Sequence, residues 1–262
     1  MGIDTWRDFR GEVCALTWSA DSAHFVAWHG IAVYRFDASG SAVVAYPDPR
    51  ASARDVNRVY LRAVLPAANQ RLGWQALHAS AALTSRGVVV FCGLSGHGKS
   101  TLAYACRAAG MTQWADDSVV LRPTSSGAEA LALPFDFSLR PESTSFFHPE
   151  RGQDVLLLGR VEQASPGRAP VAAICLIQRS DDTAPVMIAA VEPGQAFTRL
   201  LPHACTFSMV DPDQRRRNLE EYLDLSTRVP VWDVTYPRGF SRLAGVVDAL
   251  RHQVESSPST AG

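Results

Sequence analysis

The chain has 262 residues, of which 47% are hydrophobic and 19% are charged. These fractions are typical of a folded globular protein and exclude a collagen, a coiled coil and a disordered linker protein. Basic and acidic residues nearly cancel, at a formal charge of -1, so we expect no nucleic acid and no membrane as partners. The polar amino terminus is unlike a signal peptide, which favours a cytoplasmic location.

The first part of the chain predicts a small β-rich cap with one helix. Residues 24–28 and 31–36 have the pattern of a hairpin around His29-Gly30, and residues 42–45 favour a third strand. A helical pattern follows from residue 52 to about residue 64 and is expected to stop near Pro66. We assign residues 1–73 to this cap, which could meet a peptide.

Two apolar segments then predict a hairpin. Residues 77–83 and 87–92 have the composition of strands, and the short connection between them places Leu83 opposite Val88. Continuing that register puts His78 beside Gly93. A structural role and a catalytic role for His78 both remain open on this pattern.

A glycine-rich motif follows the second of these strands. Residues 93–100 fit G-x-x-x-x-G-K-[ST], and residues 99–109 favour a helix that stops at Gly110. Lys99 is the only lysine among 25 basic residues. A strand, a glycine loop and a helix in this order predict a phosphate-binding loop, with backbone N–H groups and one ammonium directed at phosphate oxygens. The expected nucleotide-binding residues are Gly93, Ser95, Gly96, His97, Gly98, Lys99, Ser100 and Thr101.

Two adjacent acids come after the loop helix. Asp116 and Asp117 precede an apolar strand, and neighbouring residues in an extended segment point to opposite sides. One carboxylate is then expected to take a proton from an incoming hydroxyl, and the other to hold a metal ion.

The remaining segments predict scaffolding. Strands are expected at 171–178, 186–191 and 231–236, with helices from Asp211-Pro212 to residue 223 and over 240–254. The five cysteines are widely spaced, which favours buried thiols over a disulfide or zinc site. Arg140 and Arg217 are candidates to clamp a phosphoryl group, although a solvated helix face also explains Arg217.

The motifs LHASAAL, GLSGHGKSTLA and ADDSVVL resemble the catalytic domain of the HPr kinase/phosphorylase family, including stand-alone relatives such as the lasso-peptide precursor kinases. His78 lies 21 residues before Lys99 and Asp116 lies 17 residues after it, as in that family. The resemblance implies that Asp116 is the base, that His78 modulates its proton affinity, and that Ser100 and Asp117 hold magnesium. It also implies an α/β fold, with a phosphate-loop domain of the HPr kinase and phosphoenolpyruvate carboxykinase type and a mixed, largely antiparallel sheet.

The sequence departs from this family at the glycine-rich signature that normally follows the aspartate pair, which is absent. HPr as substrate and the reverse phosphorylase reaction are therefore not predicted. We expect a kinase domain at 74–254 and a disordered tail at 255–262. Three functions compete: an ATP- and magnesium-dependent kinase of a serine in a peptide or small protein, a kinase of a small hydroxylated metabolite, and a non-catalytic nucleotide-binding switch. A homo-oligomer is left open.

Overall fold

The structure, a computed structural model, describes residues 3–7, 11–37, 39–40, 42–151, 156–161, 167–180, 184–205 and 212–257. The chain folds into two units. The first consists of Met1–Ala76 and Cys205–Glu221, and the second of Leu77–Ala204 and Tyr222–Gly262. The fold is α/β, with a mixed sheet in the second unit and a separate antiparallel sheet in the first.

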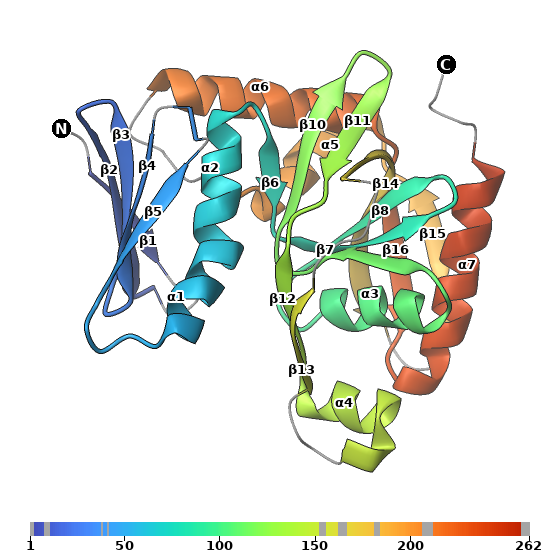
Figure 1. Ribbon diagram of the computed structural model, residues 1–262. Coiled ribbons are helices and arrows are strands. Elements are labelled where there is room, and N and C mark those ends of the chain that lie inside the picture. Colours follow the sequence, from blue (N-terminus) through green and yellow to red (C-terminus); the bar gives the residue numbers. More distant parts are fainter. Residues whose placement is uncertain are drawn as a thin grey trace. The chain divides into compact units, whose positions relative to one another are not determined.

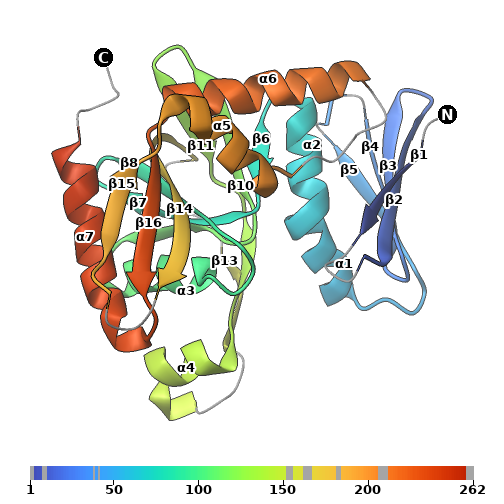
Figure 2. The same cartoon turned by 180° about the vertical axis from the view of Figure 1, so that it is seen from behind.

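The first unit contains an antiparallel sheet whose strands follow one another in chain order (Figures 1 and 2). They are β1 (Ile3–Arg7), β2 (Val13–Ala20), β3 (Ala23–Trp28), β4 (Ala32–Asp37) and β5 (Val43–Pro47). The predicted hairpin and third strand correspond to β3, β4 and β5. The prediction missed β1 and β2, whose alternation of exposed and less exposed residues is a strand pattern in its own right.

The helical segment of the first unit runs through Pro66 instead of stopping there. It consists of α1 (Ala53–Val59), the π-helical turn η1 (Tyr60–Val64) and α2 (Leu65–Arg71). Ser52 caps α1 by accepting a hydrogen bond from the N–H of Asp55. Pro66 lies in the first turn of α2, directly after the π-helical turn, and a first-turn proline needs no N–H partner within its helix. The expected stop at Pro66 was therefore wrong.

A segment far along the chain completes the first unit. Gln70 donates from Nε2 to the carbonyl oxygen of Cys205 at 2.7 Å, and Cys205 N–H donates to the carbonyl oxygen of Ala76 at 2.8 Å. Arg71 also donates to the Gln214 amide oxygen at 3.4 Å. The predicted boundary after residue 73 is close to the break after Ala76, but it left out Cys205–Glu221 because these contacts are not local in sequence.

The second unit is built on a mixed sheet. β14 pairs in parallel with β8 and β16, whereas β7 with β8, β7 with β9, β10 with β11, β11 with β14, and β15 with β16 are antiparallel. The expectation of a mixed, largely antiparallel sheet is confirmed. The strands are β6 (Gln75–Leu77), where the chain passes from the first unit to the second, β7 (Ala79–Thr84), β8 (Gly87–Cys92), β9 (Thr112–Ala115), β10 (Val119–Thr124), β11 (Gly127–Leu131), β14 (Arg168–Ser180), β15 (Met187–Ala190) and β16 (Val231–Pro237).

The predicted hairpin register is confirmed. Leu83 pairs with Val88, and the pairing continues to Ala79 opposite Cys92. His78 directly precedes β7 and Gly93 directly follows β8, so both lie just beyond the paired residues, and the strand predicted at 77–83 is interrupted at His78. A separate two-stranded sheet joins β12 (Phe135–Leu139) to β13 (Leu156–Val161).

Apolar side chains cover both faces of the mixed sheet. Val89 and Phe91 of β8 pack with the face that meets α3 (Lys99–Ala108) and α7 (Leu243–Ser256), whereas Val88 and Val90 pack on the opposite face. Because both faces of β8 are covered, all of its side chains are buried, and this explains why its sequence is apolar throughout. The remaining helical segments are α4 (Pro141–Phe147), η2 (Pro149–Arg151), α5 (Pro193–Leu200), η3 (Leu201–His203), α6 (Pro212–Arg228) and η4 (Phe240–Arg242).

The ends of the late helices differ from the expectations. α6 continues to Arg228, five residues beyond the predicted end, while its predicted cap Asp211 lies outside the described residues. α7 reaches Ser256, two residues into the predicted disordered tail, and residues 258–262 are not described.

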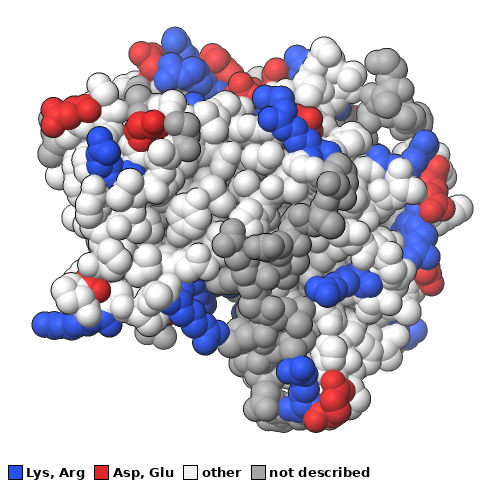
Figure 3. All heavy atoms as spheres, in the orientation of Figure 1, with Lys and Arg blue, Asp and Glu red and all other residues white. Residues whose placement is uncertain are grey.

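The surface carries mixed charges, and the buried thiols that the sequence predicts are found at three of the five cysteines. On the face seen in Figure 3, basic and acidic side chains are interspersed. Cys92, Cys106 and Cys175 are buried free thiols, and Cys14 and Cys205 are partly buried. Of the described helices, none is both long and apolar enough to cross a membrane.

The Tyr34 hydroxyl joins the sheet of the first unit to its helix, since it donates to the carbonyl oxygen of Val56 at 2.7 Å. We predict that Tyr34→Phe lowers the free energy of unfolding by about 1 kcal/mol, because a buried hydrogen bond is lost while the ring remains. Urea unfolding measures the change. Tyr46→Phe removes the same group from an exposed ring and should change stability by less than about 0.5 kcal/mol; equal effects of the two substitutions would contradict the assignment.

Candidate functional site

The glycine-rich loop, residues 93–98, connects β8 to α3 and needs glycine at both of its ends. A Cβ on Gly93 would lie 2.8 Å from the carbonyl oxygen of Ile177. At Gly98 the backbone is left-handed, at φ +92°, and a Cβ would lie 2.6 Å from Nη2 of Arg179. A side chain at position 93 would push the loop away from the backbone of β14, and at position 98 the left-handed backbone itself disfavours any residue but glycine.

The loop presents the amino end of α3. The first hydrogen bond of this helix runs from Leu102 N–H to the Gly98 carbonyl at 2.8 Å, so by helix geometry the N–H groups just before Leu102 have no acceptor within the helix. Such groups, with the positive end of the helix dipole, favour an anion. One backbone N–H of the loop has a partner within the loop, since the N–H of His97 donates to the carbonyl oxygen of Leu94 at 3.1 Å.

Lys99 begins α3 directly after this loop and is largely buried, at 8% exposure. Its Nζ donates to the Gly93 carbonyl at 2.8 Å. Burial is the main cause that lowers the pKa of Lys99, and Arg140 adds to this effect, whereas Asp117, Cys92 and Asp116 raise it. The loop therefore holds a cation in a position with little water, where a bound anion gains most from it.

Asp116 is also buried, at 5% exposure, at the end of β9. The Ser80 hydroxyl, on the neighbouring strand β7, donates to its Oδ1 at 2.6 Å. A hydrogen bond from a fully buried serine fixes the carboxylate orientation and stabilises its charged form. The Asp116 carboxylate therefore has an orientation fixed by Ser80 and lies near the ammonium of Lys99.

Asp117 does not continue the extended backbone that the sequence analysis assumed. Its φ is +63°, so the chain turns between β9 and β10. Its carbonyl oxygen accepts a hydrogen bond from Nδ1 of the exposed His78 at 3.0 Å. Asp117 is itself the left-handed residue, a conformation that aspartate tolerates better than most residues. Both acids affect the pKa of Lys99.

The other predicted loop residues lie in the loop and in the first turn of α3. Ser95 and Gly96 are exposed, and Ser100 is partly buried in the first turn of α3. The Thr101 hydroxyl lies 3.1 Å from that of Ser143 in α4. The imidazole of His97 donates a hydrogen bond from Nδ1 to the carbonyl oxygen of Ile177 at 3.2 Å. This side chain therefore joins the loop to β14.

The two candidate clamp arginines have different positions. Arg140 precedes α4, is exposed, and lies near enough to Lys99 to lower its pKa. Arg217 belongs to the first unit and donates to Gln214 at 3.2 Å. The structure therefore places Arg140 close to Lys99 within the second unit, whereas Arg217 belongs to the other unit.

Sequence reasoning missed several residues at this site. Arg179 and Tyr236 are register partners at the carboxyl ends of β14 and β16, and both lie against Gly98. The Tyr236 hydroxyl donates to the His97 carbonyl at 2.6 Å. Arg179 directly follows the predicted strand at 171–178, which is a signal for a site residue in a parallel sheet, but its neighbours could not be known from the sequence.

His203 is a further missed residue. Its carbonyl oxygen accepts from the His78 N–H at 2.7 Å. Burial lowers the pKa of its imidazole, and Lys99, His78 and His97 lower it further. Lys99, His78 and His97 therefore all lie close enough to His203 to disfavour its protonation.

This arrangement can bind a polyanion and accept a proton from a nearby group. The N–H groups at the start of α3, with Lys99, Arg140 and Arg179, fit the phosphates of a nucleotide. Ser100 and Asp117 offer oxygen ligands of the kind that magnesium prefers. Among the described residues, no group of three or more His, Cys, Asp or Glu gathers as a metal site on its own.

Comparison with known proteins gives a limited result. The chain matches no protein-family model and no curated protein sequence. It is similar to the solved structure of the Hpr(Ser) kinase/phosphatase from Coxiella burnetii, at 12% identity and a TM-score of 0.36, over 69% of this chain and 97% of that one. These values do not assign the chain to a family.

The imidazole of His203 predicts a pH dependence of stability. Because the pKa of His203 is lowered in the folded protein, the unfolded chain takes up a proton first as the pH falls below 6.5, the ordinary value. The stabilising contribution is complete above that pH and is lost as the pH falls through the lower folded value. Urea unfolding on both sides of pH 6.5 should show a shallower acid loss for His203→Gln than for the wild type. The matched control is His252→Gln, at an exposed position of α7; an unchanged slope in His203→Gln would contradict the prediction.

Proposed function

We propose that the protein is an ATP- and magnesium-dependent kinase that transfers the γ-phosphate to a serine hydroxyl of a peptide or small protein. One observation carries this proposal: a buried ammonium, a buried carboxylate and the amino end of a helix meet at a glycine-rich loop. A phosphate-binding loop with a proton acceptor beside it is the minimum that phosphoryl transfer needs.

The nucleotide would be held by groups of the second unit. Backbone N–H groups of residues 98–101, the Lys99 ammonium and the Arg140 and Arg179 guanidiniums supply the positive field. Ser100 and Asp117 are the residues proposed to hold magnesium. When bound, ATP supplies the phosphoryl group and the metal ion offsets its charge.

Asp116 is proposed to accept the proton of the acceptor hydroxyl. Ser80 donates to Oδ1 of this carboxylate, which fixes the orientation in which the group would accept that proton. His78 binds the backbone of Asp117 and so supports the turn that carries both acids. We propose that it acts through this turn.

The acceptor class rests on the resemblance of the three sequence motifs to HPr-kinase-like enzymes, which act on serine. A ribosomal natural-product precursor is one peptide of this kind. A kinase of a small metabolite would use the same two carboxylates, whereas a nucleotide switch would not need Asp116. Transfer to serine peptides encoded near the gene separates these cases.

Lys99→Ala is predicted to abolish nucleotide turnover, because the phosphate charge would lose its only buried ammonium. The measurements are ATP consumption and binding of a fluorescent ATP analogue. Arg107→Ala removes an exposed cation from the same helix and should keep full activity. Wild-type activity in Lys99→Ala would refute the assignment of the loop.

Asp116→Asn is predicted to keep nucleotide binding and to lose transfer by roughly 10²–10⁴-fold, the usual contribution of a general base. The amide oxygen can still accept from Ser80, so the fold should be retained. Single-turnover transfer of labelled phosphate measures the effect, with Asp248→Asn on α7 as the control. An unchanged rate would remove Asp116 from this role and favour the nucleotide switch.

A further inference from the structure

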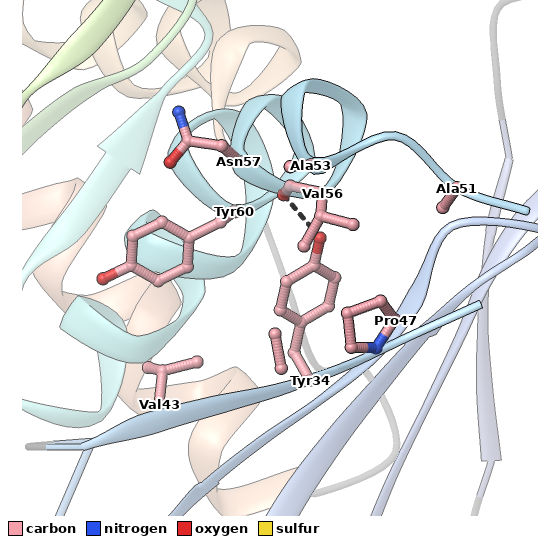
Figure 4. A pocket seen from close by; sticks show the side chains of 9 residues that line it. Tyr34, Val43, Pro47, Ala51, Ala53, Val56, Asn57 and Tyr60 are labelled. Carbon is pink, nitrogen blue, oxygen red and sulfur yellow. Dashed lines mark hydrogen bonds between the residues drawn. The ribbon is translucent and has the colours of Figure 1, made fainter. Parts of the chain in front are cut away.

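The first unit contains a hollow that the proposed phosphoryl transfer does not use. It has a volume of about 470 Å³ and lies between β5 with its neighbour β4 and the helix α1. Figure 4 shows its lining residues: Tyr34, Val43, Ala45, Pro47, Ala51, Ala53, Val56, Asn57 and Tyr60. This volume is within the range of sites that bind small molecules or side chains.

The lining of the hollow is mainly apolar. Tyr34 is fully buried, and its hydroxyl is already paired with the Val56 carbonyl at 2.7 Å (Figure 4). Burial raises the pKa of Tyr34 to about 12, so the hydroxyl stays a donor. The polar ends of Asn57 and Tyr60 point away from Tyr34 in Figure 4. The hollow therefore favours an apolar side chain, with polar groups available beside it.

The strand next to the hollow is an edge. Within the described residues, β5 pairs only with β4, and four of its five residues are exposed. Its sequence, VVAYP, carries no charge, whereas the opposite edge strand β1 carries Asp4 and Arg7. Charges on an edge discourage pairing with another chain, and β5 lacks them.

Both faces of β5 offer contact area for an added strand. Residues 43, 45 and 47 line the hollow, and the alternate residues Val44 and Tyr46 are 45% and 54% exposed. An added strand would gain main-chain hydrogen bonds from the edge and would direct alternate side chains into the hollow.

Positive charge lies beside the hollow. Arg54 and Arg58 are exposed on α1, one turn apart, and each follows a lining residue, Ala53 or Asn57. Residues four apart lie on the same side of a helix. Their guanidiniums are suited to carboxylates of a segment that crosses the helix face.

From the uncharged edge, the hollow and the two arginines, we propose that β5 and α1 bind an extended acidic peptide, which adds as a strand to β5 and places an apolar side chain in the hollow. This deepens the proposed function and rests on it, because the peptide is the acceptor or a segment joined to it. Holding such a segment on the first unit would raise the effective concentration of its serine for the second unit.

The probe is a random dodecapeptide library displayed on phage and selected on the immobilised full-length protein without nucleotide. The enriched peptides are then synthesised with a fluorophore, and their affinity is measured by fluorescence anisotropy. We expect Asp or Glu residues around one apolar or aromatic residue. N-methylation of alternate residues should abolish binding, because an added strand needs its N–H groups.

Three variants locate the site. Ala45→Trp fills the hollow and should weaken binding at least tenfold, and Arg54→Glu with Arg58→Glu should do the same for the acidic peptides. Val13→Trp adds the same side chain at an exposed position of β2 and should leave the affinity unchanged. Circular dichroism of each variant checks that the fold is retained.

Several outcomes would overturn the proposal. These are no enriched peptide, equal affinity for the wild type and Ala45→Trp, or a dimer in solution that Ala45→Trp dissociates, which would make the edge a contact between two copies. Because the assay contains no nucleotide, a failed kinase assignment would leave peptide binding intact. If both proposals hold, Ala45→Trp should raise the KM for a serine-containing selected peptide and leave kcat unchanged.

Discussion

The parallel pairing of β14 with both β8 and β16 is the constraint on which the candidate site depends. Parallel strands end at the same edge of a sheet, so the loop after β8 and the last residues of β14 and β16 meet there. The loop lies so close to β14 that a Cβ at Gly93 would clash with the Ile177 carbonyl, and the side chains of Arg179 and Tyr236 lie against Gly98. This pairing places Arg179 and Tyr236, which lie far from the loop in sequence, beside it in space.

The same edge concentrates charge in a poorly hydrated place. A buried ammonium is costly unless carboxylates or hydrogen-bond acceptors surround it, and Lys99 has the Gly93 carbonyl and two aspartates nearby. Asp116 in turn has the hydroxyl of Ser80. Each charge of the site is thus partly balanced by a neighbour, and a bound polyanion would complete that balance.

The sequence predicted best what is determined locally. The register of β7 with β8 followed from a short connection, and the start of α3 followed from the glycines and the helix formers after them. Arg179, Tyr236, Ser80 and His203 could not be found, because their positions depend on pairings between distant strands and turns. Two errors had local causes that the pattern conceals: the π-helical turn that lets the helix pass Pro66, and the left-handed turn at Asp117. The roles of the site residues remain predictions.

The first unit is discontinuous in sequence, and this affects how the protein is made. During synthesis, the segment Cys205–Glu221 leaves the ribosome long after residues 1–76. The hydrogen bond from the Gln70 amide to the Cys205 carbonyl can therefore form only after most of the second unit has been translated. The contacts of α2 and Ala76 with this segment consequently form late, and a gene fragment that stops at residue 76 would encode an incomplete unit.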